Sequence, residues 1–312
     1  MNPDRVTYIL ALWLFTSCSQ DGKAPLDTPT TGEITISVDE TFRPVIESEV
    51  STFMSLYHYA KINVKYTSEA EAFSNLLNDS ARLIIVTRNL LPDEKKHFDR
   101  IKIFPRVIKA GVDAIAFIVN EENTDTNITL SALREIFGGK KRRWEQLNAH
   151  SRTGEIKIIF DNKNSGTARY IKEVLCGNSE NLPSNTFAVN TNPDVVDYVA
   201  KDKNAIGVIG VNWISDGDDP MSLGFLSKVN VMAVASDTSG VVLPEFIQPF
   251  QAYIAQKKYP FCRDMLIISR EARSGLGTGF AAFVAGDKGQ RIILKSGLLP
   301  AAMPVRIINL HN

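Results

Sequence analysis

The chain has 312 residues, of which 44% are hydrophobic and 22% charged, and its 35 basic side chains balance 35 acidic ones. This composition is that of a globular protein with enough chain for two domains. A formal net charge of zero argues against a strongly basic nucleic-acid binder, so we expect no nucleic-acid partner.

The first predicted element is a targeting segment. Residues 8–15 (YILALWLF) form an apolar run that is too short to span a bilayer and is typical of the core of a signal peptide. Small residues and then Cys18 follow, an order that resembles the lipobox of bacterial lipoproteins, in which the cysteine is lipidated. We therefore predict a signal peptide over 1–17, a lipid anchor at Cys18 and a polar, flexible tether over 18–32. The alternative for Cys18 is an unmodified thiol near a cleavage site.

Strand-like and helix-like patterns alternate from residue 33 onward, which indicates an α/β protein. Residues 114–119 form a long apolar strand that we expect to cross between two domains. The other predicted strands lie at 34–38, 62–66, 83–86, 156–160, 205–210, 229–235 and 264–268. The predicted helices lie at 41–57, 70–77, 130–137, 165–175, 195–200 and 279–295, and one more begins at Pro92.

The two remaining cysteines, Cys176 and Cys262, fall in different predicted domains. Buried free thiols are the simplest interpretation, because cysteine packs like a small apolar residue. No pair of cysteines has the spacing of a metal site. We therefore expect neither a disulfide between them nor a bound metal.

The stretch Ser165-Gly166-Thr167 stands where the strand at 156–160 has ended and the next helix begins. The first amides of a helix have no partner within the helix, and the helix dipole is positive there, so this end attracts an anion. Two hydroxyls add donors, and the glycine lets a ligand approach the backbone. The stretch is therefore either an ordinary N-cap after a tight turn or a cradle for an oxyanion.

Two more junctions between a strand and a helix have the same character, at 39–42 (DETF) and 87–89 (TRN). In parallel α/β sheets such junctions lie at the carboxyl ends of the strands, where ligands bind. Junctions that belong to different domains would face each other across a cleft. We therefore expect Thr41, Thr87 and Thr167 to converge on one point.

Six segments carry a resemblance to a known family: VDETFRP (38–44), ARLIIVTRNLLPDE (81–94), LREIFGGKKRRWEQL (133–147), FDNKNSGTARY (160–170), AIGVIG (205–210) and FAAFVAGDKGQRIILKSGLLPA (280–301). In this order and spacing they resemble the phosphate-binding (PstS-like) proteins of bacterial ABC transporters, within the type II periplasmic binding-protein fold. The likeness covers nearly the whole chain after the predicted signal peptide.

The resemblance implies a mixed α/β fold of two lobes joined by two crossing strands, with lobe I over 33–112 and 251–312 and lobe II over 113–250. It implies a monomeric binding protein rather than an enzyme. Inorganic phosphate or a similar oxyanion would be held between the lobes, without a cofactor or metal, and recognised with the protein by an ABC permease. The protein would lie in the cell envelope, on the periplasmic or extracellular face, and would touch the membrane only through its lipid anchor. The implied ligand-binding residues are Thr41, Phe42, Thr87, Arg88, Ser165, Gly166 and Thr167.

One position departs from the family. Where the family commonly has an arginine, four residues before the signature serine, this chain has Asp161. A carboxylate there repels phosphate unless one of the two groups carries a proton or an arginine compensates, and Arg88 and Arg169 are the candidates. The alternative is that Asp161 caps the loop and points away from the cleft. Asp161 and Arg169 are therefore additional candidates for the ligand site.

Three other patterns have simpler interpretations. The basic run at 140–143 is expected in a solvated loop, because a nucleic-acid site needs a larger basic field. The glycines of 275–279 lack the spacing and context of a dinucleotide-binding loop and are expected to be a flexible entry to the last helix. A hydrolase that uses Ser165 needs a base and an orienting acid, and none of the four histidines stands at a strand-end junction. The main alternative is the same fold binding another anion, for sensing or another envelope role.

Overall fold

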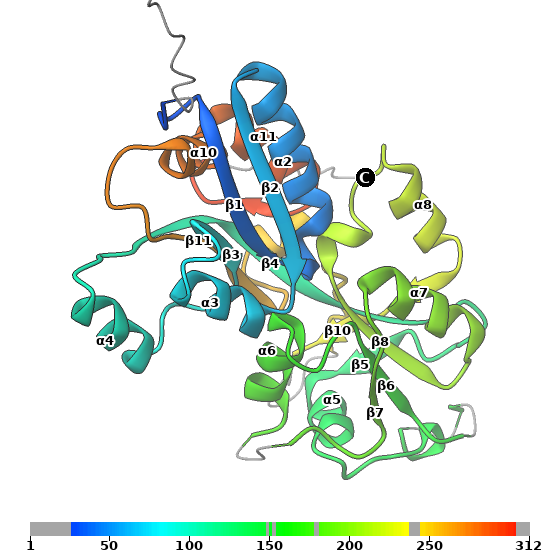
Figure 1. Ribbon diagram of the computed structural model, residues 1–312. Coiled ribbons are helices and arrows are strands. Elements are labelled where there is room, and N and C mark those ends of the chain that lie inside the picture. Colours follow the sequence, from blue (N-terminus) through cyan, green and yellow to red (C-terminus); the bar gives the residue numbers. More distant parts are fainter. Residues whose placement is uncertain (1–25, 148–149, 152–153, 178–180, 237–243, 304–312) are drawn as a thin grey trace, which may run out of the picture.

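The computed structural model describes residues 26–147, 150–151, 154–177, 181–236 and 244–303 (Figure 1). The predicted signal peptide and Cys18 lie outside these ranges. The described chain forms two halves, named here lobe I, around strands β1, β2, β3 and β11, and lobe II, around β6, β7 and β8.

Lobe I combines the first βα units of the chain with its last helices. Helix α2 turns Val45, Ile46 and Phe53 inward, and the Phe53 ring meets the edge of Phe280. Helical spacing of these apolar side chains thus covers one face of the sheet. The elements of lobe I are β1 (Gly32–Asp39), η2 (Glu40–Phe42), α2 (Arg43–Leu56), β2 (Ala60–Thr67), α3 (Glu69–Leu77), β3 (Leu83–Val86), α4 (Pro92–Arg100), β11 (Cys262–Ser269), α10 (Leu276–Ala285), α11 (Asp287–Lys295) and β12 (Leu299–Pro300).

Lobe II holds the middle of the chain, drawn in green and yellow at the lower right of Figure 1. Its core includes Phe117, whose ring packs edge to face with the rings of Phe137 and Phe261. The elements of lobe II are β5 (Asn127–Thr129), α5 (Leu130–Phe137), η3 (Trp144–Gln146), β6 (Lys157–Phe160), α6 (Gly166–Leu175), β7 (Thr186–Ala188), α7 (Asn192–Lys201), β8 (Ala205–Gly210), η4 (Val211–Trp213), α8 (Pro220–Leu226), β9 (Val229–Val231) and β10 (Ala233–Ala235).

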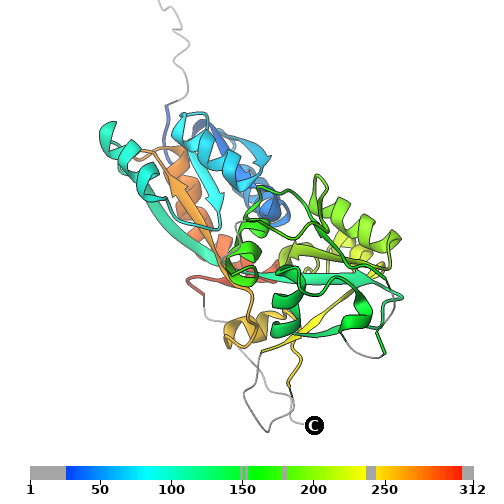
Figure 2. The same ribbon diagram turned by 90° about the horizontal axis from the view of Figure 1, so that it is seen from below.

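One strand belongs to both lobes. Strand β4 (Arg106–Asn120) pairs through its first part with β11 and through residues 115–119 with β8, antiparallel in both cases. The sheet order is therefore β2-β1-β3-β11-β4-β8-β6-β7, with β9 and β12 also on β4 and with β5 and β10 in a small separate sheet. Figure 2 shows β4 running from one lobe into the other. The chain returns through α9 (Gln251–Ala255) and β11.

Parallel pairing places the site. Strand β1 pairs in parallel with β2 and β3, and β6 pairs in parallel with β7 and β8. The carboxyl ends of β1 and β3 therefore lie at one edge of lobe I, and those of β6 and β8 lie at one edge of lobe II. These two edges meet between the lobes, as the contacts of the next subsection establish.

Two elements that were predicted to be continuous are each interrupted in the structure. The helix predicted over 279–295 is two helices, because the chain is extended at Gly286, and Gly289 then packs closely against the backbone of α10. The strand predicted over 229–235 is split at Met232, whose amide donates to the carbonyl of Phe117, so that β9 pairs with β4 and β10 with β5. Both errors arise because apolar spacing runs on through the break.

The glycine-rich segment 275–279 contains the start of α10, and carboxylates accept hydrogen bonds from the backbone amides there. Oε2 of Glu271 accepts from the amides of Gly275, at 3.3 Å, and Thr278, at 2.6 Å. Oδ1 of Asp27 accepts from the amide of Leu276 at 2.9 Å. The part of the predicted tether that holds Asp27 is therefore bonded to lobe I.

Both cysteines that the structure describes, Cys176 and Cys262, are free.

Candidate functional site

The end of β1 supplies the first part of the site. Oδ1 of Asp39 accepts from the amide of Thr41 at 3.1 Å and so caps the short helix η2. Thr41 and Phe42 are fully buried, and helix α2 follows directly, with a proline in its first turn. This capped turn fixes the hydroxyl of Thr41 at the edge of lobe I that faces lobe II.

The end of β3 supplies the second part. Oε1 of Glu69, the first residue of α3, accepts from the amide of Thr87 at 2.7 Å and from its hydroxyl at 2.6 Å. Two bonds to one carboxylate hold the threonine side chain in a single orientation. Thr87 thus lies at the same edge of lobe I as Thr41.

The end of β6 supplies the third part, from lobe II. Ser165 is the N-cap of α6, since its Oγ accepts from the amide of Ala168 at 3.2 Å. The same hydroxyl donates to Oδ1 of Asp161 at 2.7 Å. The N-cap interpretation of Ser165 therefore holds, and the open question is what the first amide of α6 binds.

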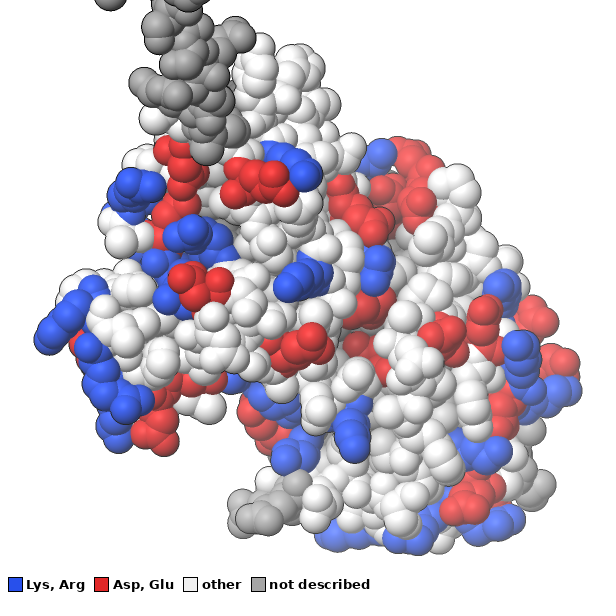
Figure 3. All heavy atoms as spheres, in the orientation of Figure 1, with Lys and Arg blue, Asp and Glu red and all other residues white. Residues whose placement is uncertain are grey.

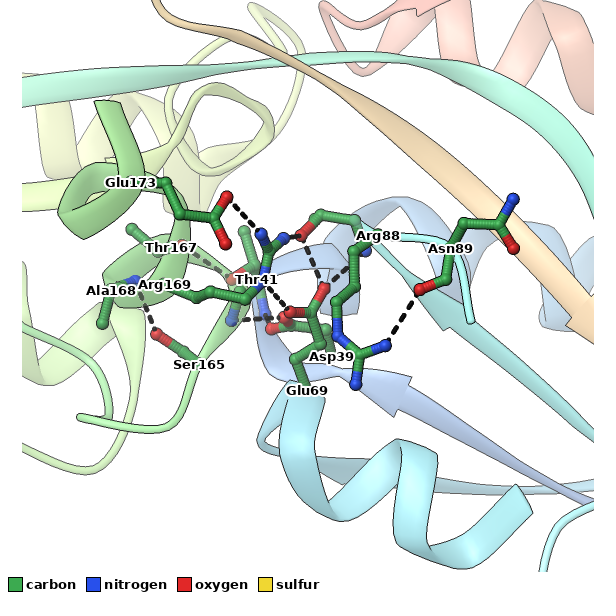
Figure 4. A network of polar contacts seen from close by, with 12 residues as sticks. Asp39, Thr41, Glu69, Arg88, Asn89, Ser165, Thr167, Ala168, Arg169 and Glu173 are labelled. Carbon is green, nitrogen blue, oxygen red and sulfur yellow. Dashed lines mark hydrogen bonds and ion pairs between the residues drawn. The ribbon is translucent and has the colours of Figure 1, made fainter. Parts of the chain in front are cut away.

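The lobes bond to each other through these three junctions (Figure 4). The hydroxyls of Thr41 and Thr167 are 3.1 Å apart, and the amide of Gly166 donates to Oδ2 of Asp39 at 2.8 Å. Nη2 of Arg169 donates to Oγ1 of Thr87 at 2.7 Å. The structure thus brings Thr41, Thr87 and Thr167 to one place between the lobes.

Gly166 stands at the tightest point of this contact. A Cβ atom added there would lie 2.5 Å from Oδ2 of Asp39 and 2.8 Å from Oγ1 of Thr87. Real side-chain atoms do not approach this closely, so any other residue would either push the side chains of Asp39 and Thr87 aside or hold the lobes apart. A glycine here allows the helix start to reach the opposite lobe.

Lobe II holds Thr41 from a second side that the sequence did not predict. The side chains of Asn212 and Trp213, in η4, donate to the carbonyl of Thr41 at 3.0 and 2.9 Å. Nearby, Nδ2 of Asn192 donates to Oε2 of Glu40 at 2.5 Å. A usable signal existed, because η4 follows the carboxyl end of β8, which is parallel to β6.

The two candidate arginines occupy different places. Arg169 reaches across from α6, with Nε bonded to Oε2 of Glu69 at 2.6 Å. Arg88 instead bonds Glu94 within lobe I at 2.8 Å, and its guanidinium lies over the ring of Phe73. Only the first of these guanidinium groups bridges the two lobes.

Two buried carboxyl groups of the site have opposite pKa shifts. Burial, with the charge of Glu69 nearby, raises the pKa of Asp39 to about 7. Burial acts in the same direction on Glu69, but hydrogen bonds from Arg169 and Thr87 outweigh it, so the pKa of that carboxyl ends below its usual value. Glu69 is therefore the ionised partner of Arg169, whereas Asp39 changes charge near neutral pH, as does Glu40, whose pKa burial also raises to about 7.

Asp161 is also buried, and Ser165 bonds only one of its oxygens. Burial raises the pKa of Asp161, against the bond from that serine. Further back, Nε of Arg263 donates to Oδ2 of Asp113 at 2.9 Å across the β4–β11 pair. The site is therefore rich in carboxyl groups as well as in donors. Figure 3 shows acidic atoms in the seam between the lobes.

The described part of the chain contains no cluster of three or more His, Cys, Asp or Glu residues that could hold a metal ion. Over the same residues, no helix has both the length and the apolar character needed to span a bilayer.

A family model described as PBP superfamily domain matches residues 23–288. The chain belongs to the PBP superfamily. Curated relatives include the phosphate-binding protein PstS of Borreliella burgdorferi, 21% identical over 85% of this chain and 89% of that protein, and PstS of Staphylococcus saprophyticus, 24% identical over 83% and 77%. The predicted resemblance to PstS-like substrate-binding proteins is thus confirmed.

Solved structures agree on the fold. A Clostridium perfringens protein described as a phosphate ABC transporter substrate-binding protein, with bound phosphate, is 20% identical, with a TM-score of 0.73 over 86% of this chain and 100% of that one. An ABC-type phosphate transport receptor from Vibrio cholerae is also 20% identical, with a TM-score of 0.63 over the same shares. The predicted mixed α/β fold is therefore confirmed. The relatives and solved structures named here are described as phosphate-binding or phosphate-transport proteins.

Proposed function

We propose that this chain is an extracytoplasmic solute-binding protein that captures inorganic phosphate between its lobes for an ABC importer. The observation that carries the proposal is the convergence of Thr41, Thr87 and the Ser165–Thr167 junction from two lobes on one buried place. Hydroxyls and a helix-start amide are donors that suit a tetrahedral oxyanion. The PstS relatives support phosphate as the ligand.

Arg169 takes the compensating role in this proposal. Its guanidinium already bridges the lobes through Glu69 and Thr87, whereas Arg88 is engaged with Glu94. A guanidinium beside the anion offsets the carboxylate that Asp161 brings in place of the family arginine. We leave Arg88 out of the proposed ligand shell and keep Phe42 as a backbone contributor at the start of α2.

The proposal extends to delivery and location. Closure of the lobes around the anion would create the shape that a membrane permease recognises. A lipid on Cys18, followed by a short tether, would hold the monomer at the periplasmic or extracellular face of a membrane. Mass spectrometry of the protein expressed in a bacterium would test the anchor, since a mature chain that begins at an unmodified residue contradicts it.

Calorimetry with a panel of anions tests the central claim. Phosphate, sulfate, molybdate and small carboxylates are titrated into the purified chain at neutral pH. Binding of phosphate in the micromolar range, about −8 kcal/mol, is within reach of several bonds to a charged ligand of about 1.5–3 kcal/mol each. If a different anion of the panel binds instead, that anion is the ligand and the assignment of phosphate is wrong. If none of them binds, the proposed capture function is refuted.

A further inference from the structure

The donors expected to hold an anion are already occupied by the protein's own carboxylates. The amide of Gly166, the first of the ten-residue helix α6, donates to Oδ2 of Asp39 at 2.8 Å. The other oxygen of Asp39 accepts from the amide of Thr41. Asp39 therefore stands at the helix start in the place of an anionic ligand.

Other charges surround this carboxylate on every side. Glu69 on α3, Asp161 after β6 and Arg263 on β11 act on Asp39 electrostatically. Arg169 on α6 bonds Glu69, Asp113 on β4 bonds Arg263, and Arg43 lies 3.6 Å from Glu40. The described residues thus gather five buried carboxyl groups, those of Asp39, Glu40, Glu69, Asp113 and Asp161, against the three guanidinium groups just named.

An oxyanion that accepted a hydrogen bond from the amide of Gly166 would therefore be surrounded by buried carboxyl groups. It would lie beside Asp39 and close to Glu69, because both carboxylates approach Gly166. Two like charges in one buried site are not both retained when a proton is available to neutralise one of them. Glu69 keeps its charge, because Arg169 and Thr87 donate hydrogen bonds to it. The proton therefore goes to another carboxyl group, and Asp39 is the one that competes with the anion for the amide of Gly166.

We propose that Asp39 is an internal anion that holds the amide of Gly166 across the cleft, and that an incoming oxyanion displaces it while Asp39 takes up one proton from solvent. The inference rests on the proposed function, and it assigns to Asp39 the dependence of phosphate affinity on pH. Asp39 is accordingly a gatekeeping residue in the cleft rather than a further donor to the anion.

The direction of the pH dependence follows from the burial of this carboxyl. Burial raises the pKa of Asp39 to about 7, and a bound anion raises it further. Below that pH the free protein already carries the proton, and the affinity is insensitive to it. Above that pH binding takes up a proton, so the affinity falls by up to about tenfold per pH unit through this group alone.

Isothermal titration calorimetry with inorganic phosphate tests the proposal. Wild type, Asp39→Asn and a control, Asp93→Asn, are titrated between about pH 6 and pH 9, each in two buffers of different ionisation enthalpy, which gives the number of protons taken up. Asp93 carries the same substitution on a side chain that is 92% exposed in α4. Because phosphate itself titrates in this range, the difference between wild type and Asp39→Asn isolates the residue.

We expect Asp39→Asn to bind phosphate about tenfold more tightly than wild type near pH 8, to match it near pH 6, and to take up close to one proton fewer at the higher pH. Equal affinities and equal proton uptake at every pH would overturn the inference, as would weaker binding by Asp39→Asn throughout, which would make Asp39 a direct contact of the anion. If Asp39→Asn does not fold, the proton uptake of wild type is compared with the change in the ionisation of phosphate itself over the same pH range. The absence of any uptake beyond that change overturns the inference. Phosphate binding by neither protein at any pH refutes the proposed function as well.

Discussion

The replacement of Gly166 by alanine is the most direct test of lobe closure. The added methyl group would meet side-chain oxygens of Asp39 and Thr87 at 2.5 and 2.8 Å, so the bonds that these side chains make across the lobes cannot form as they do here. Ser165 still caps α6, and neither lobe core contains the new atom, so each lobe keeps its own fold. The expected effect is therefore on ligand affinity rather than on folding.

The size of the effect follows from the bonds that closure makes. In the proposed complex the amide of Gly166 gives its bond to the anion instead of to Asp39, about 1.5–3 kcal/mol, and the Thr41–Thr167 pair gives about 0.5–1.5 kcal/mol. Loss of both weakens phosphate binding by about 2–4.5 kcal/mol, or about 30-fold to 2000-fold.

Calorimetry measures this affinity, and small-angle scattering in phosphate reports whether the lobes stay apart. The matched control is Gly224→Ala, because nothing lies within 4 Å of a Cβ atom added at that position of α8. We expect the control to bind like wild type. A Gly166→Ala protein that binds phosphate within about twofold of wild type would refute the reasoning.

Three further predictions concern buried charge and capping. Arg169→Ala should weaken phosphate binding by at least about tenfold, because Glu69 then faces the anion without its guanidinium partner, whereas Arg88→Ala should leave the affinity within about twofold; calorimetry that finds the reverse order contradicts the assignment. Glu49→Gln should stabilise the protein at pH 7 by up to about 3 kcal/mol: burial raises the pKa of Glu49 to about 8 from 4.5, so wild-type stability falls as pH rises between these values, and urea unfolding at several pH values should find no such loss in the variant. Ser165→Ala should cost about 1 kcal/mol through loss of the α6 cap, measured by thermal unfolding, and an unchanged melting temperature would contradict the capping role.

The sequence was sufficient to predict the three junctions because the rule behind them is topological. Parallel strands expose their carboxyl ends at one edge, and Thr41, Thr87 and Thr167 each stand just past such an end. The amino-acid sequence also shows directly that these positions carry hydroxyl side chains near the starts of predicted helices. The contacts of these residues in the structure follow from that placement.

The acceptors at the same place were not predicted, for a physical reason. A pattern of hydroxyls and amides identifies donors, but it does not say which side chain of the chain itself satisfies them. Glu69 begins the helix after β2, which is a fourth junction of the same kind, and Asn212 follows β8. Both stand at strand ends that were not predicted to face the cleft.

The orientation of Arg88 was equally outside the reach of sequence. The pair Thr87-Arg88 has adjacent residues, yet the first turns to the cleft and the second to Glu94 and Phe73. Neighbouring residues of an extended chain point to opposite sides, and only the packing of α3 and α4 decides which side meets the other lobe.

A crystal structure of the protein grown with phosphate measures the central claim most directly. The account predicts tetrahedral density between Thr41, Thr87 and the first amides of α6, with Arg169 beside it and Asp39 no longer bonded to Gly166. Density for phosphate elsewhere, with the Asp39–Gly166 bond intact, would contradict it.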